Sequence, residues 1–144
     1  MIVLDTTVLV YAVGVDHPLR EPSRQLVDAI GAGTLSATTT VEVIQELAHV
    51  RARRLDRNDA AQLASDYTRL LGPLLLVTEQ HLRSGLDLWK RHSALGCFDA
   101  VMAAAAMSSG ATLVSADKAF GRVPGLRHID PTAPASLADL GLDG

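Results

Sequence analysis

Short apolar runs alternate along this chain with longer segments in which apolar residues recur at helical period. The short runs occupy residues 2–4, 34–37, 112–115 and 127–129. Each run is too short for a helix and is typical of a strand buried within a sheet. Because strands that alternate with helices pair in parallel, the pattern predicts an α/β sandwich with a mainly parallel central sheet.

Helical segments fill the intervals between these runs. They are predicted at residues 21–30, 41–50, 58–71, 79–92 and 98–107, with residues 74–77 as a strand or an extended link. Asn58 or Asp59 can cap the third helix and Thr78 the fourth, and Gly31 and Gly110 supply natural ends. The carboxyl ends of parallel strands form the edge at which such sheets bind ligands.

The 144 residues suit one domain. Apolar residues make up 48% of the chain and aromatic residues only 3%, which indicates an aliphatic core. We predict a domain over residues 1–130, followed by a tail over residues 131–144 that carries a loosely attached helical turn.

Charge and cysteine content narrow the function classes. The formal charge of −3 excludes a uniformly basic surface but not a local basic patch. Cys97 is the single cysteine, so neither an internal disulfide nor a Cys-rich zinc site is possible. The sequence contains neither a signal peptide nor an apolar run long enough to span a membrane. These features predict a cytoplasmic protein.

Four acidic residues are placed to meet at the ligand-binding edge of the sheet. Asp5 and Asp117 follow predicted strands, and Glu42 and Asp99 lie in the first turns of predicted helices. Carboxylates gathered in one place repel one another unless a cation neutralises them, and an all-oxygen site suits Mg²⁺ or Mn²⁺. A bound cation of this kind activates water for hydrolysis of a phosphodiester. The arrangement therefore indicates metal-dependent phosphodiester hydrolysis.

Each acid also has an ordinary structural interpretation. Asp5 and Asp117 are typical helix-capping or turn residues, and Glu42 can be a solvated charge on a helix face. Glu46 lies one turn beyond Glu42 and competes with it as the second acid. Asp99 is the most informative of the four, because a carboxylate among apolar neighbours is costly unless it is paired, caps a helix or binds an ion.

Several short motifs together resemble the PIN domain, and in particular the VapC-like toxins of bacterial and archaeal toxin–antitoxin modules. They are Asp5-Thr6-Thr7 after the first strand, Ser36 six residues before Glu42, Phe98-Asp99-Ala100 at the start of an alanine-rich helix, and Leu113-Val114-Ser115-Ala116-Asp117 followed by Phe120. The resemblance extends from residue 2 to about residue 130 and lies mainly in the order and spacing of the acids.

This resemblance implies a three-layer PIN-like sandwich and an Mg²⁺- or Mn²⁺-dependent endoribonuclease that is the toxin of a toxin–antitoxin pair. It also implies a homodimer, inhibited by a VapB-like antitoxin that inserts a segment into the active-site groove. Asp5, Glu42 and Asp99 match the metal-binding acids, and Asp117 matches the fourth acid. Thr7 and Ser115 match hydroxyl groups that orient the site; Thr7 departs from the more common Ser.

Basic residues supply candidate contacts to the RNA backbone. Arg51 and Arg54, in the cluster that ends the second predicted helix, and Lys118, beside Asp117, are the strongest of them. The arginine cluster is also explained as a solvated helix end favoured by the helix dipole.

Two other functions compete with the nuclease. One is a non-catalytic α/β domain that binds RNA or a partner protein and uses its acids as caps. The other is a phosphatase of the haloacid-dehalogenase type, whose second Asp two residues after the nucleophile is replaced here by Thr7.

Overall fold

The computed structural model describes residues 1–133 and 135–142. Its sheet contains the strands β1 (Ile2–Leu4), β2 (Ala37–Thr38), β3 (Thr112–Val114) and β4 (His128–Ile129). The strands are all parallel and follow the order β2-β1-β3-β4. β1 therefore lies inside the sheet between β2 and β3, and its three residues are buried, as the apolar run predicts.

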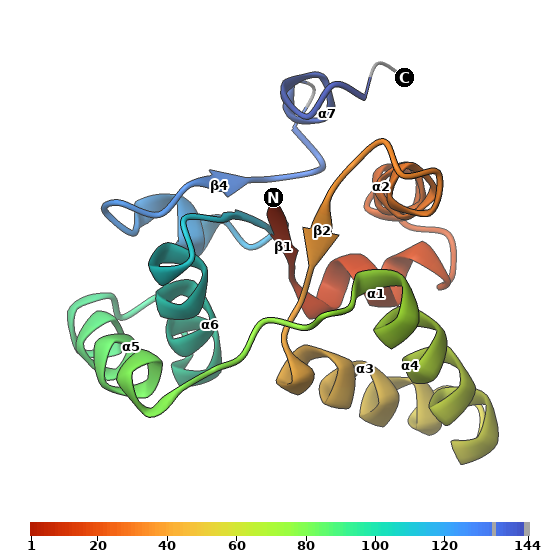
Figure 1. Ribbon diagram of the computed structural model, residues 1–144, viewed down its shortest axis with the longest axis horizontal. Coiled ribbons are helices and arrows are strands. Elements are labelled where there is room, and N and C mark those ends of the chain that lie inside the picture. Colours follow the sequence, from red (N-terminus) through yellow and green to blue (C-terminus); the bar gives the residue numbers. More distant parts are fainter. Residues whose placement is uncertain (134, 143–144) are drawn as a thin grey trace.

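Helices cover both faces of this sheet (Figure 1). They are α1 (Thr6–Ala12), α2 (Arg20–Gly31), α3 (Val41–Arg54), α4 (Arg57–Leu71), α5 (Glu79–Arg91), α6 (Cys97–Ser108) and α7 (Ser136–Asp139), with a 3₁₀ helix, η1 (Lys118–Arg122). The first four helices lie on one side of the sheet, and α5 and α6 pack together on the other (Figure 1). The predicted three-layer α/β sandwich is confirmed.

The core is aliphatic, as the composition predicts. Leu4, Leu9, Leu26, Leu47 and Leu113 are all fully buried. Small alanine side chains dominate the buried face of α6, which lets this helix lie close to β3 and α5. No helix in the described part of the chain is long and apolar enough to cross a membrane.

Helix ends agree with local sequence rules, with two corrections. Thr78 begins α5 with a capping box completed by His81. α4 begins two or three residues earlier than the predicted caps imply, because the side chain of Asp56, rather than that of Asn58 or Asp59, accepts the backbone hydrogen bond of its first turn. The prediction also missed α1, although Asp5 caps it and Val8, Leu9 and Ala12 form its buried face.

The remaining differences concern short segments. β2 forms at Ala37–Thr38, toward the end of the run predicted at residues 34–37. Residues 74–77 form an extended link held to the end of β2 by a single bridge between Thr40 and Leu75. In the tail, α7 places Leu137 against the core, so the tail is more closely attached than predicted.

Candidate active site

The carboxyl ends of β1 and β3 place two acids side by side. Asp5 follows β1 directly, and Ser115 and Asp117 follow β3, its parallel neighbour. The backbone N–H of Asp5 donates to the carbonyl of Val114 at 3.0 Å, which extends the strand pairing up to the site. The sheet itself therefore fixes the relative positions of these residues.

Asp5 is held by three hydrogen bonds. Its Oδ1 accepts from the backbone N–H of Thr6 at 2.7 Å, and its Oδ2 accepts from the hydroxyls of Thr7 at 3.2 Å and Ser115 at 2.7 Å. Burial nevertheless raises the pKa of the Asp5 carboxyl above its usual range, against the lowering effect of these bonds, and the nearby charge of Glu46 raises it further.

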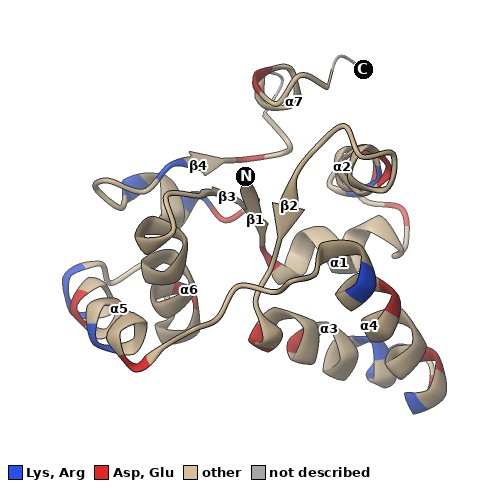
Figure 2. Ribbon diagram, viewed as in Figure 1, with Lys and Arg blue, Asp and Glu red and all other residues tan. Residues whose placement is uncertain are grey.

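Asp99 faces the same region from the first turn of α6. Burial, and then the charges of Asp5, Asp117 and Glu46, raise the pKa of the Asp99 carboxyl to about 6. The mutual effect of acids from four separate segments indicates an excess of negative charge at this edge of the sheet. Figure 2 shows acidic segments on α3, on α6 and at the end of β1.

Glu46, and not Glu42, joins this group. The Thr6 hydroxyl donates to Oε2 of Glu46 at 2.9 Å, which ties α3 to the start of α1 beside Asp5. Oε2 of Glu42 is buried and has no hydrogen-bond partner within the described chain. The assignment of Glu42 as the second acid is thus not supported by the geometry, which favours its competitor one turn further along the helix.

Two adjoining cavities open at the site. The acid cavity, of about 350 Å³, is lined by the acids Asp5, Glu46, Asp99 and Asp117, by Thr6, Thr7, Val10 and Tyr11 of the α1 region, and by Val50 and Arg54 of α3. A larger side cavity, of about 760 Å³, shares Glu46 and Asp99 with it and is also lined by Glu42, Gln45, His49, Cys97 and Phe98. Glu42 thus lines the side cavity but not the acid cavity.

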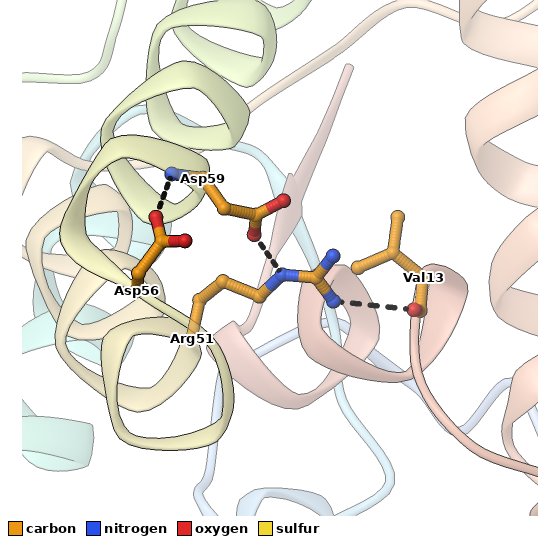
Figure 3. Close-up of polar contacts among 4 residues, drawn as sticks. All are labelled: Val13, Arg51, Asp56 and Asp59. Carbon is orange, nitrogen blue, oxygen red and sulfur yellow. Dashed lines mark hydrogen bonds and ion pairs between the residues drawn. The ribbon is translucent and has the colours of Figure 1, made fainter.

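The three predicted phosphate-binding residues differ in their positions. Arg54 lines the acid cavity. Arg51 turns away from it: its Nε donates to Oδ1 of Asp59 at 2.6 Å and its guanidinium reaches the carbonyl of Val13 at 3.5 Å, as Figure 3 shows. Lys118 is exposed on η1 and lines neither cavity. Of these residues, only Arg54 is brought to the site.

Thr6 and Tyr11 are site residues that the sequence analysis overlooked. Both lie on α1 and line the acid cavity. The Tyr11 ring also stacks on the ring of His17, with 4.1 Å between centroids. The signal that would have revealed them is the capped helix that follows Asp5.

The donor set suits a hard divalent cation. Asp5, Glu46, Asp99 and Asp117 offer only oxygen atoms, and burial, followed by their mutual repulsion, raises the pKa values of Asp5 and Asp99. Within the described residues, however, no group of three or more Asp, Glu, His or Cys side chains is close enough to enclose an ion. Mg²⁺ keeps several waters and binds through one or two carboxylates, so such a cage is not required.

A model of the PIN domain matches residues 2–126 of this sequence. The chain belongs to the PIN domain family. The fold and family predicted from the acid spacing are thereby confirmed.

Relatives within the PIN domain family cover nearly the whole chain. Ribonuclease VapC7 of Mycobacterium tuberculosis is 50% identical over an alignment of 146 positions. The alignment covers 98% of this chain and 99% of that protein. Ribonuclease VapC23 of the same species is 32% identical, over 79% of this chain and 90% of its own length.

Solved structures share the PIN fold at lower identity. One is the crystal structure of VapBC2 from Rickettsia felis bound to a DNA fragment from the promoter. It contains a chain that is 19% identical in sequence, with a TM-score of 0.70, and the match covers 89% of this chain and 97% of that chain. The crystal structure of FitAcB from Neisseria gonorrhoeae contains a chain that is 18% identical in sequence, with a TM-score of 0.71. The match covers 91% of this chain and 98% of that chain.

Proposed function

We propose that this PIN domain is a metal-dependent endoribonuclease, the toxin of a toxin–antitoxin pair. The observation that supports this most directly is the acid cavity, where carboxylates from four distant segments surround one open space. The ribonuclease VapC7, at 50% identity over nearly the full chain, supports the choice of RNA as substrate.

One or two of the carboxylates of Asp5, Asp99, Glu46 and Asp117 would hold Mg²⁺ or Mn²⁺ directly, and the others would act through water. When bound, the cation lowers the pKa of a coordinated water and neutralises the charge that develops on the phosphodiester. Asp5 contributes a carboxylate that Ser115 and Thr7 hold in a fixed orientation.

The other side chains of the cavity orient the substrate. Arg54 lines the acid cavity, where its guanidinium would pair with a phosphate of the bound strand. Tyr11 lines the same cavity and would offer an aromatic surface to a nucleotide.

A VapB-like antitoxin is the inhibitory partner in this proposal. Structural relatives include a toxin–antitoxin complex from Klebsiella pneumoniae, with a TM-score of 0.67. The side cavity offers a place for a partner segment, because it combines the half-exposed Phe98 ring with the carboxylates of Glu46 and Asp99. An apolar residue followed by a basic one would fit this combination.

A homodimer and a cytoplasmic location complete the proposal. Leu82, Leu86 and Trp89 recur at helical spacing on α5 and are all exposed, which is typical of a helix face that packs against a second copy. Cys97 is an exposed free thiol, which suits a reducing compartment.

A non-catalytic role is the competing function. It is favoured by the capping bonds that Asp5 and Asp117 make to the backbone N–H groups of Thr6 and Ala119, since these bonds alone explain both residues. It does not explain the convergence of Asp99 and Glu46 on the same cavity.

Cleavage of a total-RNA pool by the purified, antitoxin-free protein tests the proposal. Discrete fragments should appear with Mg²⁺ or Mn²⁺ and disappear with EDTA. The Asp99→Asn variant, which keeps the size of the side chain and removes its charge, should give no fragments. If the folded wild-type protein cleaves no RNA in either metal, or if Asp99→Asn cleaves as well as wild type, the proposal is wrong.

A further inference from the structure

A small basic hollow lies outside the acid cavity, between the end of α5 and η1. It measures about 200 Å³ and is lined by Arg91, His92, Ser93, Ala94, Ala119 and Arg122. Three of these side chains carry nitrogen donors, and none is a carboxylate. This concentration of basic groups stands out in a chain whose formal charge is −3.

Both walls of the basic hollow lead directly to the acids of the site. One wall, residues 91–94, comes just before α6, whose first turn carries Asp99. The other wall belongs to η1, which Asp117 caps through the backbone N–H of Ala119 at 2.9 Å. Two short segments of the chain therefore connect the hollow to Asp99 and Asp117.

The two arginines of the basic hollow keep their charges available. Among the described residues, the side chain of Arg91 bonds only through its Nε, to the backbone carbonyl of Asp87 at 3.3 Å. The carboxylate of Asp87 pairs instead with Lys90 at 3.4 Å. Arg122 is exposed and forms no ion pair with any residue of the described chain.

The helix dipole explains only part of this arrangement. Arg91 and Lys90 complement the carboxyl end of α5, where positive charge is favourable. Arg122 belongs to a different element and gains nothing from that dipole, yet it lines the same hollow. A concave site with guanidinium groups from two elements is the form that oxyanions such as phosphate require.

We propose that the basic hollow binds a backbone phosphate of the RNA strand, a few nucleotides from the bond that is cleaved. This inference rests on the proposed nuclease function. Arg54 lines the acid cavity, so the hollow would give the strand a second basic contact. Contacts of this kind set the register of a strand and do not read its sequence.

The test compares RNA binding by two variants, both made in the Asp99→Asn background so that the strand stays intact. The probe is a single-stranded RNA that contains the site cleaved by the wild-type protein, and Mg²⁺ is present. Arg91→Gln/Arg122→Gln removes both charges of the hollow. The control, Arg83→Gln, removes a charge from the same helix where Arg83 pairs with Glu79.

Loss of one phosphate contact should weaken RNA binding by the double variant roughly ten-fold. The slope of log Kd against log salt concentration should fall in magnitude by about 0.7, whereas Arg83→Gln should leave it unchanged. In the active protein, the same two substitutions should raise KM and leave kcat nearly unchanged.

Methylphosphonate linkages, which remove one phosphate charge at a time, locate the contact. At the linkage that the hollow contacts, a methylphosphonate should weaken RNA binding by the Asp99→Asn protein. The same methylphosphonate should not weaken RNA binding by the protein that also carries Arg91→Gln/Arg122→Gln. If every linkage affects the two proteins equally, or if the salt slope is unchanged, the basic hollow does not bind the strand. Absence of RNA cleavage by the wild-type protein would instead refute the nuclease proposal on which this inference rests.

Discussion

The Ser115 hydroxyl donates a 2.7 Å hydrogen bond to Oδ2 of Asp5, a residue 110 positions away in the sequence. Oγ of Ser115 also accepts a hydrogen bond from the backbone N–H of Asp117 at 3.0 Å. Ser115 is fully buried and therefore connects the ends of two strands through one fixed atom. Behind it, the His128 ring contacts the Ser115 carbonyl at 2.8 Å.

Ser115→Ala should weaken both the site and the fold. Without the hydroxyl, Asp5 loses a partner that orients it, and we expect metal affinity and cleavage to fall roughly 10- to 100-fold. The free energy of unfolding should fall by about 1 to 3 kcal/mol, because the buried Asp5 carboxylate and the partly buried backbone N–H of Asp117 each lose a hydrogen bond. Calorimetric titration with Mn²⁺ and denaturant unfolding measure the two effects. Ser109→Ala, which removes only bonds to the carbonyls of its own helix, should change metal affinity little.

Glu46→Gln should reduce cleavage at least 100-fold, and Glu42→Gln much less. Glu46 lines the acid cavity and accepts from Thr6, whereas Glu42 lines only the side cavity. The two substitutions make the same chemical change one turn apart on α3, so each is the control for the other. Equal losses of activity, compared at saturating Mg²⁺, would contradict this assignment of the second acid.

The sequence alone could not distinguish Glu42 from Glu46, for a geometric reason. Residues four apart share a helix face, so periodicity assigns both to the same side of α3. The two residues are displaced by about 6 Å along the helix axis, and only the position of α3 relative to the end of β1 decides which one meets Asp5. The strand-terminal acids were easier to place, because parallel pairing brings strand ends together.

Asp99→Asn should stabilise the metal-free protein at neutral pH. The pKa of Asp99 is raised to about 6 in the fold from 3.8, so the fold disfavours the ionised form. This cost is absent below about pH 3.8, grows as pH rises through about 6, and is constant above that. Since solvent screens the partly exposed group, we expect a gain on the order of 1 to 2 kcal/mol.

Denaturant unfolding in EDTA at several pH values measures this gain. The difference in the free energy of unfolding between variant and wild type should be absent below the lower of the two pKa values of Asp99. It should grow between these two values and persist above the higher one. Excess Mg²⁺ should reverse the sign at pH 7, because only the wild-type carboxylate gains from the cation. A difference that does not change with pH would show that charge is not its cause.

Most of the fold could be predicted from local patterns, and the exceptions have physical reasons. α3 and α5 begin at the capping residues Thr40 and Thr78, and α6 is marked by its long apolar, alanine-rich run. α1 was missed because its seven residues are nearly all apolar or Thr, and such a segment lacks the polar face that marks an amphipathic helix. Tyr11 was missed with it.

Arg51→Gln should affect stability and leave catalysis intact. Arg51 joins α3 to α4 through Asp59 and reaches the end of α1 through the Val13 carbonyl (Figure 3). The pair is only partly exposed, so we expect a loss of about 1 kcal/mol in the free energy of unfolding. Arg54→Gln, the matched change three residues further on, should instead weaken RNA binding at unchanged stability. The prediction fails if Arg51→Gln raises KM as much as Arg54→Gln does.

Among single methyl groups that could be added to α5, the one introduced by Gly85→Ala should lower the free energy of unfolding the most. A Cβ at this position would lie 2.6 Å from Cα and 2.7 Å from Cγ2 of Val101, so α5 and α6 could not keep their present spacing. Backbone cannot move aside as a flexible side chain does, and we expect a loss of about 2 to 3 kcal/mol in the free energy of unfolding. Displacement of α6 also moves Asp99, so metal affinity should fall as well.

Gly31→Ala is the matched control, because it makes the same change in the last turn of α2, where the new methyl group would meet nothing within 4 Å. It should raise the free energy of unfolding by about 0.5 kcal/mol through improved helix propensity. Denaturant unfolding of both variants separates the two effects. If Gly85→Ala is as stable as Gly31→Ala, the close approach of α5 to α6 is not required by the fold, and Asp99 must owe its position to other contacts.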